Sequence, residues 1–456
     1  MELFVYDGVL FRCRNADAEV HVPEGVVEIA EFAFSESETL ERVILPAGLR
    51  VIGDKAFKSC KKLKEVVIPS GVTKIGKYAF SDCESLTKVV LPNSLTCIGA
   101  FAFYHDSALV TVELDPESLS PEERGDSEED GIGTYAFHGT KVEAIPIPAG
   151  ITSLGNSALA YAAYLKSIVV PDHVRRIGER AFECCGRMTR VTLPDSLSDE
   201  AVGDGLFAHC SWLLHINIPS AWKRIRKDTF RRCISLRQFT IPPQIEEIGE
   251  NAFTDCANLA SLTIPKTVKT FGHGAFSKCA ALKDLTFEEG VTALGTYMFA
   301  GCKGLTDIRL PQSLTRIEAR AFISCDGLTE VHIPKNVQLI GYESFAQCAN
   351  LRTVILEDCA AHVDGFAFCE DPMLSRVELG NAVKSMSDSV FEHDRSLTKL
   401  VLPKSLREVD ICICAGCKNV EIYCEAESKP EGWKDDWSFG RTKHVHWGYK
   451  PGSEVA

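Results

Sequence analysis

The sequence predicts a mainly β repeat solenoid, because one unit of 23 residues recurs along most of the chain. The stretch Ala252–Phe276 shows the unit, since it begins and ends on an Ala-Phe pair. Counting from Phe253 as position 0, cysteine falls at +3, apolar residues at +6, +9 and +11, and proline at +12. A fixed period of this length is the signature of stacked repeats. Position 0 occurs 17 times, at Phe34, Phe57, Phe80, Phe103, Phe137, Leu159, Phe182, Phe207, Phe230, Phe253, Phe276, Phe299, Phe322, Phe345, Phe368, Phe391 and Cys414.

Each repeat contains one short strand, a turn and an inward-pointing aromatic residue. Positions +9 and +11 alternate with polar or β-branched +8 and +10, as expected for a half-buried strand. Proline at +12 ends the strand because it lacks a backbone N–H. Glycine four residues before the phenylalanine, as at Gly53 and Gly76, predicts a tight turn with positive φ. At most one short helical turn fits around Ala-Phe-x-x-Cys, and the phenylalanines should form an aromatic spine.

Three regions follow in order along the chain. Residues 1–23 form an N-terminal cap, with a hairpin turn at Asp7-Gly8. Residues 24–424 form the solenoid of 17 copies, interrupted by an acidic insertion at about 115–131. Residues 425–456 form a C-terminal cap. Because an open stack end exposes core and sheet edge, both caps are expected.

The unit AFxxCxxLxxVxIPxxVxxIGxxAF resembles the 23-residue leucine-rich repeat of the BspA type over roughly residues 20–424. The segment from Ile422 to Trp433, and the later Trp447-Gly448-Tyr449, resemble a C-terminal cap of that family. The resemblance implies a right-handed curved solenoid with a parallel sheet on its concave side. It also implies binding roles, including adhesion to host proteins, and no catalytic residues.

Composition limits the classes of partner. The net charge of -14 disfavours nonspecific nucleic-acid binding and attraction to an anionic membrane. No apolar run is long enough for a spanning helix, and the N-terminus shows no secretory signal, so we expect a cytoplasmic protein. The alternative is a cell-surface or secreted protein, if the sequence is truncated or export is non-classical.

The positions of the cysteines indicate that they pack in the core rather than form disulfides or bind a metal. Eleven of the 19 cysteines occupy position +3 and should be small buried residues, because neighbouring copies with parallel side chains make poor disulfides. Cys412, Cys414, Cys417 and Cys424 could instead hold zinc, with His444 and His446 nearby in sequence. Since Cys414 and Cys417 are already explained by the repeat, we predict no metal site and no cofactor.

The first candidate site is the outward face of the strands, at positions +8 and +10. Ile44, Val67 and Val90 form an apolar row at +10, beside the charged Arg42, Glu65 and Lys88 at +8. Other charged or polar positions on this face are Arg190, Arg309 and His332. An apolar strip with a polar rim is typical of a partner site. The alternative is that β-branched residues simply favour strands.

The second candidate is a basic cluster that reverses the sign of the chain's charge. It comprises Arg175, Arg176, Lys223, Arg224, Arg226, Arg231 and Arg232. Lys223 and Arg224 repeat the register positions of Arg175 and Arg176, which predicts one shared edge of the solenoid. An acidic partner or a phosphate group would suit it, and ordinary solvated surface is the alternative.

The acidic insertion is low in apolar residues, which is typical of a flexible surface loop. A calcium role does not match the EF-hand spacing, and docking of this loop on another copy's basic cluster is a further alternative.

No catalytic motif is present, so we predict a non-enzymatic scaffold that binds an unidentified protein through the concave face. The alternative function is a cell-surface adhesin for a host matrix protein or glycan. A further alternative is that copies of this chain bind to one another.

Overall fold

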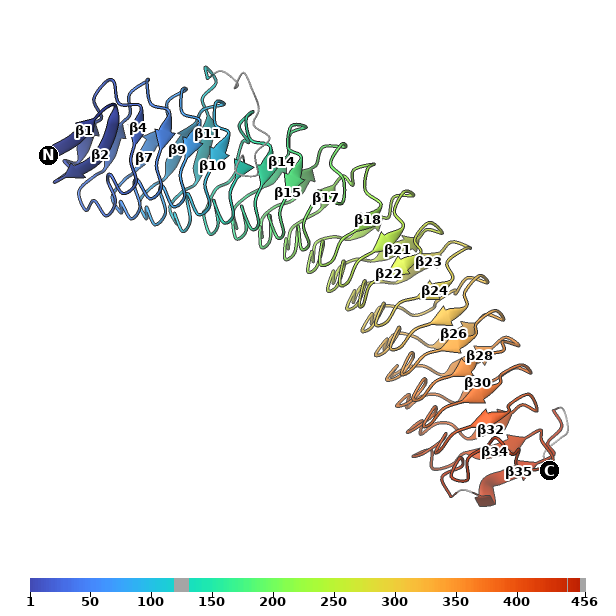
Figure 1. Cartoon of the computed structure of the whole chain (residues 1–456). Helices are drawn as coiled ribbons and strands as arrows, with labels where there is room; N and C mark the ends of the chain where they lie inside the picture. The colour runs from blue at the N-terminus through green and yellow to red at the C-terminus, as the bar shows by residue number, and fades with distance from the viewer. Residues whose placement is uncertain (119–130, 441, 452–456) are drawn as a thin grey trace. The chain divides into compact units, whose positions relative to one another are not determined.

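The protein is a parallel β-solenoid, as the repeat predicts (Figure 1). The computed structural model describes residues 1–118, 131–440 and 442–451. It divides into two compact units, Met1–Trp222 with Asp228–Ser235, and Lys223–Lys227 with Leu236–Ala456. In the described residues the only helix is the short 3-10 helix η1 (Thr442–His444), so the mainly β class is confirmed.

One strand ladder runs through positions +8 to +11, where the sequence predicts it. Neighbouring strands pair in parallel with partners 23 residues apart, for example Val66↔Val89. Val66 is buried while Glu65 and Val67 face out, and Pro92 follows the last residue of β9. The ladder strands of the first unit are β3 (Glu19–His21), β5 (Arg42–Ile44), β7 (Glu65–Val67), β9 (Lys88–Leu91), β11 (Thr111–Leu114), β14 (Ser167–Val169), β16 (Arg190–Thr192) and β17 (His215–Ile216). Those of the second unit are β19 (Gln238–Thr240), β21 (Ser261–Ile264), β23 (Asp284–Phe287), β26 (Glu330–Ile333), β28 (Thr353–Leu356), β30 (Arg376–Glu378), β32 (Lys399–Leu402) and β34 (Glu421–Cys424).

A second ladder, which the sequence did not predict, uses two-residue strands at positions -6 and -5, just before the repeat glycine. In the first unit these strands are β4 (Glu28–Ile29), β6 (Val51–Ile52), β8 (Lys74–Ile75), β10 (Cys97–Ile98), β12 (Gly131–Ile132), β13 (Ser153–Leu154) and β15 (Arg176–Ile177). In the second they are β18 (Arg224–Ile225), β20 (Glu247–Ile248), β22 (Thr270–Phe271), β24 (Ala293–Leu294), β25 (Arg316–Ile317), β27 (Leu339–Ile340), β29 (His362–Val363), β31 (Ser385–Met386) and β33 (Glu408–Val409). Each repeat is therefore held to its neighbours on two sides of the coil.

The first ladder is interrupted at the repeat of Phe299, where residues 307–310 form no strand. The +8 positions around the gap are Asp284, Asp307 and Glu330, three acidic residues on successive repeats. Like charges directly opposite one another destabilise strand pairing. The three acidic residues accompany the missing strand, but the first ladder is also divided elsewhere, between β11 and β14 and between β17 and β19.

The phenylalanine turn builds the predicted aromatic spine. Consecutive rings stack nearly parallel, with centroids 4.8 Å apart for Phe34 and Phe57 and 5.1 Å apart for Phe253 and Phe276. The backbone here is not a helical turn, because residues at -2 and +2, such as Lys55 and Ser59, have positive φ. This alternation points the N–H groups of positions -2, 0 and +2 at carbonyl oxygens of the next repeat. The bonds of one repeat are Lys55 N–H to Lys77, Phe57 N–H to Ala79 and Ser59 N–H to Ser81.

The repeat glycines serve close packing, and the prediction of positive φ for them is wrong. Gly53 and Gly76 lie outside the left-handed region, which non-glycine residues of the same turn occupy instead. A Cβ on Gly76 would lie 2.5 Å from the backbone nitrogen of Asp54 in the preceding repeat. Glycine is thus required because adjacent coils approach too closely for any side chain.

The +3 position is buried as predicted, and it also carries a hydrogen-bond donor. The Cys302 thiol lies 3.3 Å from the carbonyl oxygen of Phe276, and the Cys325 thiol 3.2 Å from that of Phe299. Three repeats have aspartate here instead of cysteine, namely Asp106, Asp371 and Asp394, and all three side chains are fully buried.

Each aspartate accepts a backbone N–H from the preceding repeat through Oδ1. For Asp106 the donor is the N–H of Cys83, at 2.8 Å. In all three residues Oδ2 has no hydrogen-bond partner among the described residues. Burial raises the pKa of these carboxyl groups well above the ordinary value.

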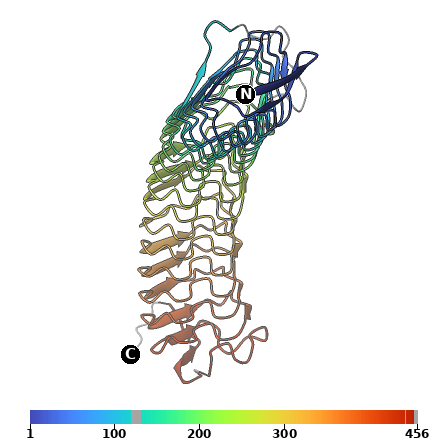
Figure 2. The same cartoon turned by 90° about the vertical axis from the view of Figure 1, so that its left-hand side faces the viewer.

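Additional strands lie next to the first and the last described repeats. The predicted N-terminal hairpin is formed by β1 (Glu2–Tyr6) and β2 (Val9–Arg14), and β2 joins the second ladder through β4. At the other end, β35 (Val445–Trp447) pairs in parallel with β34 and extends the first ladder. Figure 2 shows strands of the C-terminal repeats following one another along one side of the coils.

Candidate protein-binding surface

The apolar row at +10 is present on adjacent strands of the first unit. Ile44 lies on β5, Val67 on β7 and Val90 on β9, and Val67 pairs directly with Val90. Ile44 is 37% exposed and Val67 is 59% exposed, whereas Val90 is half-buried. These three side chains form the surface that we call the N-terminal row.

The charges beside the N-terminal row are paired with one another. Arg42 lies between Glu19 and Glu65, with nitrogen–oxygen distances of 3.6 and 3.8 Å. Lys88 contacts Glu113 at 2.8 Å. Exposed pairs of this kind contribute little stability. Both cations beside the row are therefore paired with carboxylates, which leaves apolar contact as the main property of this face.

A shallow groove of about 460 Å³ opens between β5 and β7. The two strands are in register only at Arg42↔Glu65, whereas β7 and β9 pair over three residues. Ile44 and Val67 lie on opposite sides of this groove, with Pro69 at its end. The N-terminal row therefore combines exposed apolar side chains with a concavity that a partner side chain can enter.

The other strand-face candidates lie elsewhere. Arg190 is on β16, in a separate three-stranded sheet. Arg309 and His332 belong to the second unit, where they line one groove of about 480 Å³ at the interrupted ladder. His332 there contacts Glu330, 2.5 Å away. The predicted residues thus make three separate groups rather than one surface.

The members of the basic cluster occupy different parts of the repeat and are divided between the two units. Arg176 and Arg224 hold equivalent places as first residues of β15 and β18, as the register predicts. Arg231 and Arg232 instead belong to the phenylalanine turn. The remaining members are Arg175 in the first unit, and Lys223 and Arg226 in the second.

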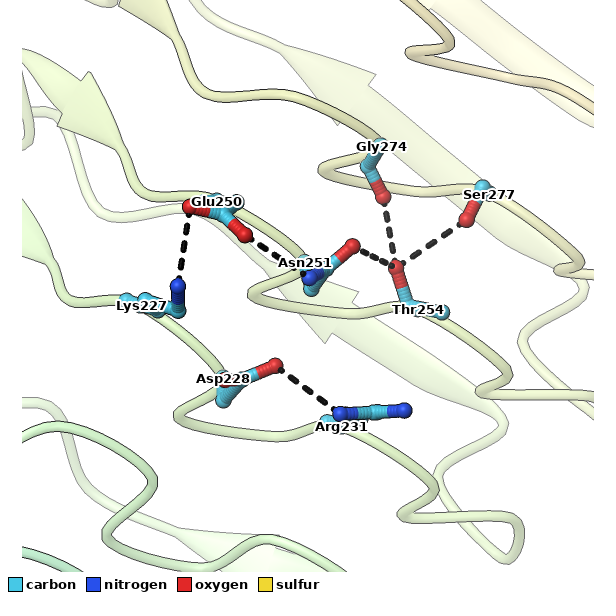
Figure 3. Close-up of polar contacts among 8 residues, drawn as sticks. All are labelled: Lys227, Asp228, Arg231, Glu250, Asn251, Thr254, Gly274 and Ser277. Atoms are coloured by element: carbon cyan, nitrogen blue, oxygen red, sulfur yellow. Dashed lines mark hydrogen bonds and ion pairs between the residues drawn. The ribbon is translucent and has the colours of Figure 1, made fainter.

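Acidic residues accompany several of these cations. Arg231 lies 3.6 Å from the Asp228 carboxylate (Figure 3). The neighbouring Lys227 contacts Glu250 at 3.0 Å. Glu179 and Glu200 line the same groove as Arg175 and Arg176, which is about 630 Å³. The local reversal of charge expected from the sequence is therefore partly cancelled in space.

The C-terminal cysteines are explained by packing. Cys414, Cys417 and Cys424 are buried, and the Cys417 thiol lies 2.9 Å from the carbonyl oxygen of Phe391. Burial raises the pKa of Cys424 to about 12, which disfavours a thiolate. His444 and His446 both contact the carboxylate of Glu421, at 2.7 and 2.8 Å. Within residues 1–118, 131–440 and 442–451, no group of three metal-ligating side chains is arranged to hold an ion.

Two further expectations concern the insertion and the membrane. Residues 119–130, most of the acidic insertion for which a surface loop was expected, lie outside the described residues. A helix long and apolar enough to cross a bilayer is not found in the described part of the chain.

A half-buried aromatic ladder was missed by sequence reasoning. Tyr78, Phe101 and Tyr135 occupy position -2 of three successive repeats and stack with centroids 4.7 and 5.2 Å apart. All three have positive φ, a conformation that bulky residues rarely adopt. The available signal was the recurrence of aromatic residues two positions before the spine phenylalanine.

Comparison with known proteins agrees with this architecture. The sequence matches the profile of the BspA type leucine rich repeat region over residues 9–120, 130–200, 200–328 and 292–421. A leucine-rich repeat protein from Bacteroides ovatus is 22% identical, with a TM-score of 0.43 over 89% of this chain and 78% of that chain. A leucine rich cell surface protein from Faecalibacterium prausnitzii is 27% identical, with a TM-score of 0.45 over 76% of this chain and 90% of that chain. No curated protein matches the chain. The profile covers most of the repeats, and the chain belongs to the BspA-type leucine-rich repeat family.

Proposed function

We propose that this protein is a non-enzymatic scaffold that binds a protein partner through the N-terminal row and the groove beside it. The observation that carries the proposal is the exposure of Ile44 and Val67 on adjacent strands whose flanking charges are already paired. Apolar centres surrounded by polar rims are typical of protein interfaces. Membership of a repeat family in which binding is the common role supports the same function.

The test is a triple substitution, Ile44→Asp, Val67→Asp and Val90→Asp. Each change places a carboxylate where the partner buries an apolar side chain, at a cost of roughly 1–2 kcal/mol per site. Affinity for a partner captured from native lysate should therefore fall at least about a hundredfold. The measurement is a binding titration, with circular dichroism to confirm that the fold is retained.

Val169→Asp provides the matched control. Val169 occupies the same +10 position on β14 and is 66% exposed, but it belongs to another sheet. It should bind the partner as the unmodified protein does. Equal affinity of the triple variant and the unmodified protein would rule out the N-terminal row as the binding site.

A second candidate function is adhesion outside the cell, to a host matrix protein or a glycan. It is favoured by the description of the Faecalibacterium prausnitzii protein as a cell surface protein. The cytoplasmic compartment expected from the sequence receives no support from the comparisons. Fractionation of native cells, followed by protease shaving of intact cells, separates the two: only a surface protein is lost on shaving.

A further inference from the structure

The outermost strand of the N-terminal hairpin has one edge without a partner. β1 is the first strand of a nine-stranded sheet, in the order β1-β2-β4-β6-β8-β10-β12-β13-β15. Among the described residues it pairs only with β2, and Figure 1 shows it at the N-terminal tip. A free strand edge presents unpaired N–H and C=O groups and is a template for another strand.

Devices that usually protect such an edge are missing from the centre of β1. Leu3, Phe4 and Val5 include neither a charge nor a proline. The register shift in the hairpin gives the extra residue, Phe11, to β2, so β1 keeps a regular outer edge. The edge is therefore competent for pairing along its length.

Exposed apolar side chains surround this edge on both faces of the hairpin. Phe4, Val5 and Phe11 are each more than two-fifths exposed, and Tyr6 is 77% exposed. Side chains alternate across a strand, so Phe4 and Tyr6 share one face and Val5 lies on the other. The hairpin thus offers backbone bonds and apolar contacts to the same partner.

We propose that a second copy of this chain pairs with β1, antiparallel, about a two-fold axis through Phe4. This register places Phe4 opposite its own counterpart, Leu3 opposite Val5 and Glu2 opposite Tyr6 of the partner. The only charge of β1, on Glu2, then meets an aromatic ring rather than a like charge. Within the hairpin Glu2 also lies opposite Arg14, so its charge is compensated.

The two-fold arrangement follows from the composition of the strand. An isologous interface requires one surface to be complementary to itself. In the parallel alternative, Glu2 would lie beside Glu2 of the partner, and like charges directly opposite destabilise a pair. Antiparallel pairing about Phe4 avoids this contact and brings Leu3, Phe4 and Val5 each against an apolar residue of the partner copy.

Charge-swap variants of the full chain test the proposal by sedimentation velocity. The unmodified protein should sediment as a dimer. Phe4→Lys and Phe4→Glu should each be monomeric, because identical charges meet at the axis. An equimolar mixture of the two variants should regain the dimer, since lysine then lies opposite glutamate.

Phe32→Glu is the matched control, because Phe32 is a comparably exposed phenylalanine in the first repeat and lies outside the hairpin. This variant should remain dimeric. A monomeric unmodified protein, a dimer that survives both single variants, or a mixture that stays monomeric would each overturn the proposal. The Phe4 variants should bind a partner of the N-terminal row normally, so this test and the test of the proposed function fail separately.

Discussion

The single residues of this chain have chemical roles set by their place in the repeat. Cysteine at +3 fills a small space in the core and donates to the carbonyl oxygen of a phenylalanine in the preceding repeat. Asp371 and Asp394 occupy the same place on successive repeats, and the Asp371 N–H donates to Asp394 Oδ1. A neutral carboxylic acid can donate through its second oxygen as a thiol does, whereas a buried carboxylate cannot.

Stability should therefore fall as pH rises, through Asp106, Asp371 and Asp394. Burial raises the pKa of all three, so the folded state holds protons that the unfolded state releases. The part of the free energy of unfolding that depends on these protons is fully present below pH 4, the pKa of the unfolded groups being near 4. It is lost as the pH rises toward the folded pKa, by about 1.4 kcal/mol per pH unit for each group. Urea denaturation across pH 4 to 9 measures it.

The triple variant Asp106→Asn, Asp371→Asn, Asp394→Asn is the control for this slope. Asparagine keeps the size and a donor but does not titrate, so the variant should lose the decline with pH that these groups cause. Other charged groups near them, including Asp82, Glu370 and Cys417, remain in both proteins. Parallel curves for the two proteins would show that the carboxyl groups are not held neutral.

Which side chains are buried can largely be predicted from the sequence, because the same residue types recur at the buried positions of each repeat. Phe253 and Cys256 are both fully buried, as their positions predict. Sequence reasoning failed where residue type does not report backbone angle: Gly76 has ordinary φ and Tyr78 has positive φ. The N-terminal row was predictable because alternation fixes which side chains face out. The basic cluster stays a prediction, because its members are divided between the two units.

The elements of the solenoid are held together by close contact between coils as much as by strand pairing. The two-residue strands, such as β6 and β8, are too short to give a periodic signal, which explains why the second ladder was not predicted. Directly after β6 and β8, at Gly53 and Gly76, the backbone of the neighbouring coil lies so close that a Cβ would clash with it. The first ladder is divided into several sheets, and residues 307–310 form no strand in it.

Gly76→Ala tests the packing role of the repeat glycine. The added methyl group meets backbone atoms of Asp54 and Gly53 at 2.5 Å, so the coils must separate. We expect a loss of roughly 1–3 kcal/mol in the free energy of unfolding, the usual cost of overpacking. Thermal or urea denaturation measures the change.

Gly48→Ala is its matched control, because a Cβ at Gly48 meets nothing within 4 Å and the residue does not have positive φ. This variant should keep or slightly raise stability, since alanine has less freedom in the unfolded chain. An equal loss in both variants would mean that backbone flexibility, rather than close approach, decides the choice of glycine.

At the scale of the whole molecule, the stability of each repeat depends mainly on the repeats next to it. Each coil contacts mainly its two neighbours, so the stability of a repeat stack is approximately a sum of repeat and interface contributions. The chain accordingly tolerates departures from the period between Phe103 and Phe207 while the buried positions are kept.

Deletion of one complete repeat, residues 323–345, should leave a folded protein. Phe322 would then be followed by Phe368 at the normal spacing of 23, and the second ladder would close over the junction, with β25 beside β29. We expect unchanged β-type circular dichroism and a modest drop in melting temperature. Deletion of residues 323–342 is the control, because this shorter cut breaks the register of the spine and should cause loss of cooperative melting or aggregation. Equal behaviour of the two deletions would contradict local, additive stability.

The uniform direction of the turn hydrogen bonds gives each unit an electrical polarity. In the turns from Phe34 to Phe182 and from Phe253 to Phe391, the N–H groups of positions -2, 0 and +2 point toward the next repeat, so their peptide dipoles add, as they do in an α-helix. In the last repeat, carbonyl oxygens of Asp436 and Trp437 receive the N–H groups of Cys412 and Ile413. A stack of this kind is directional: a repeat that adds at the C-terminal side meets donors that are already aligned, so extension costs less than nucleation.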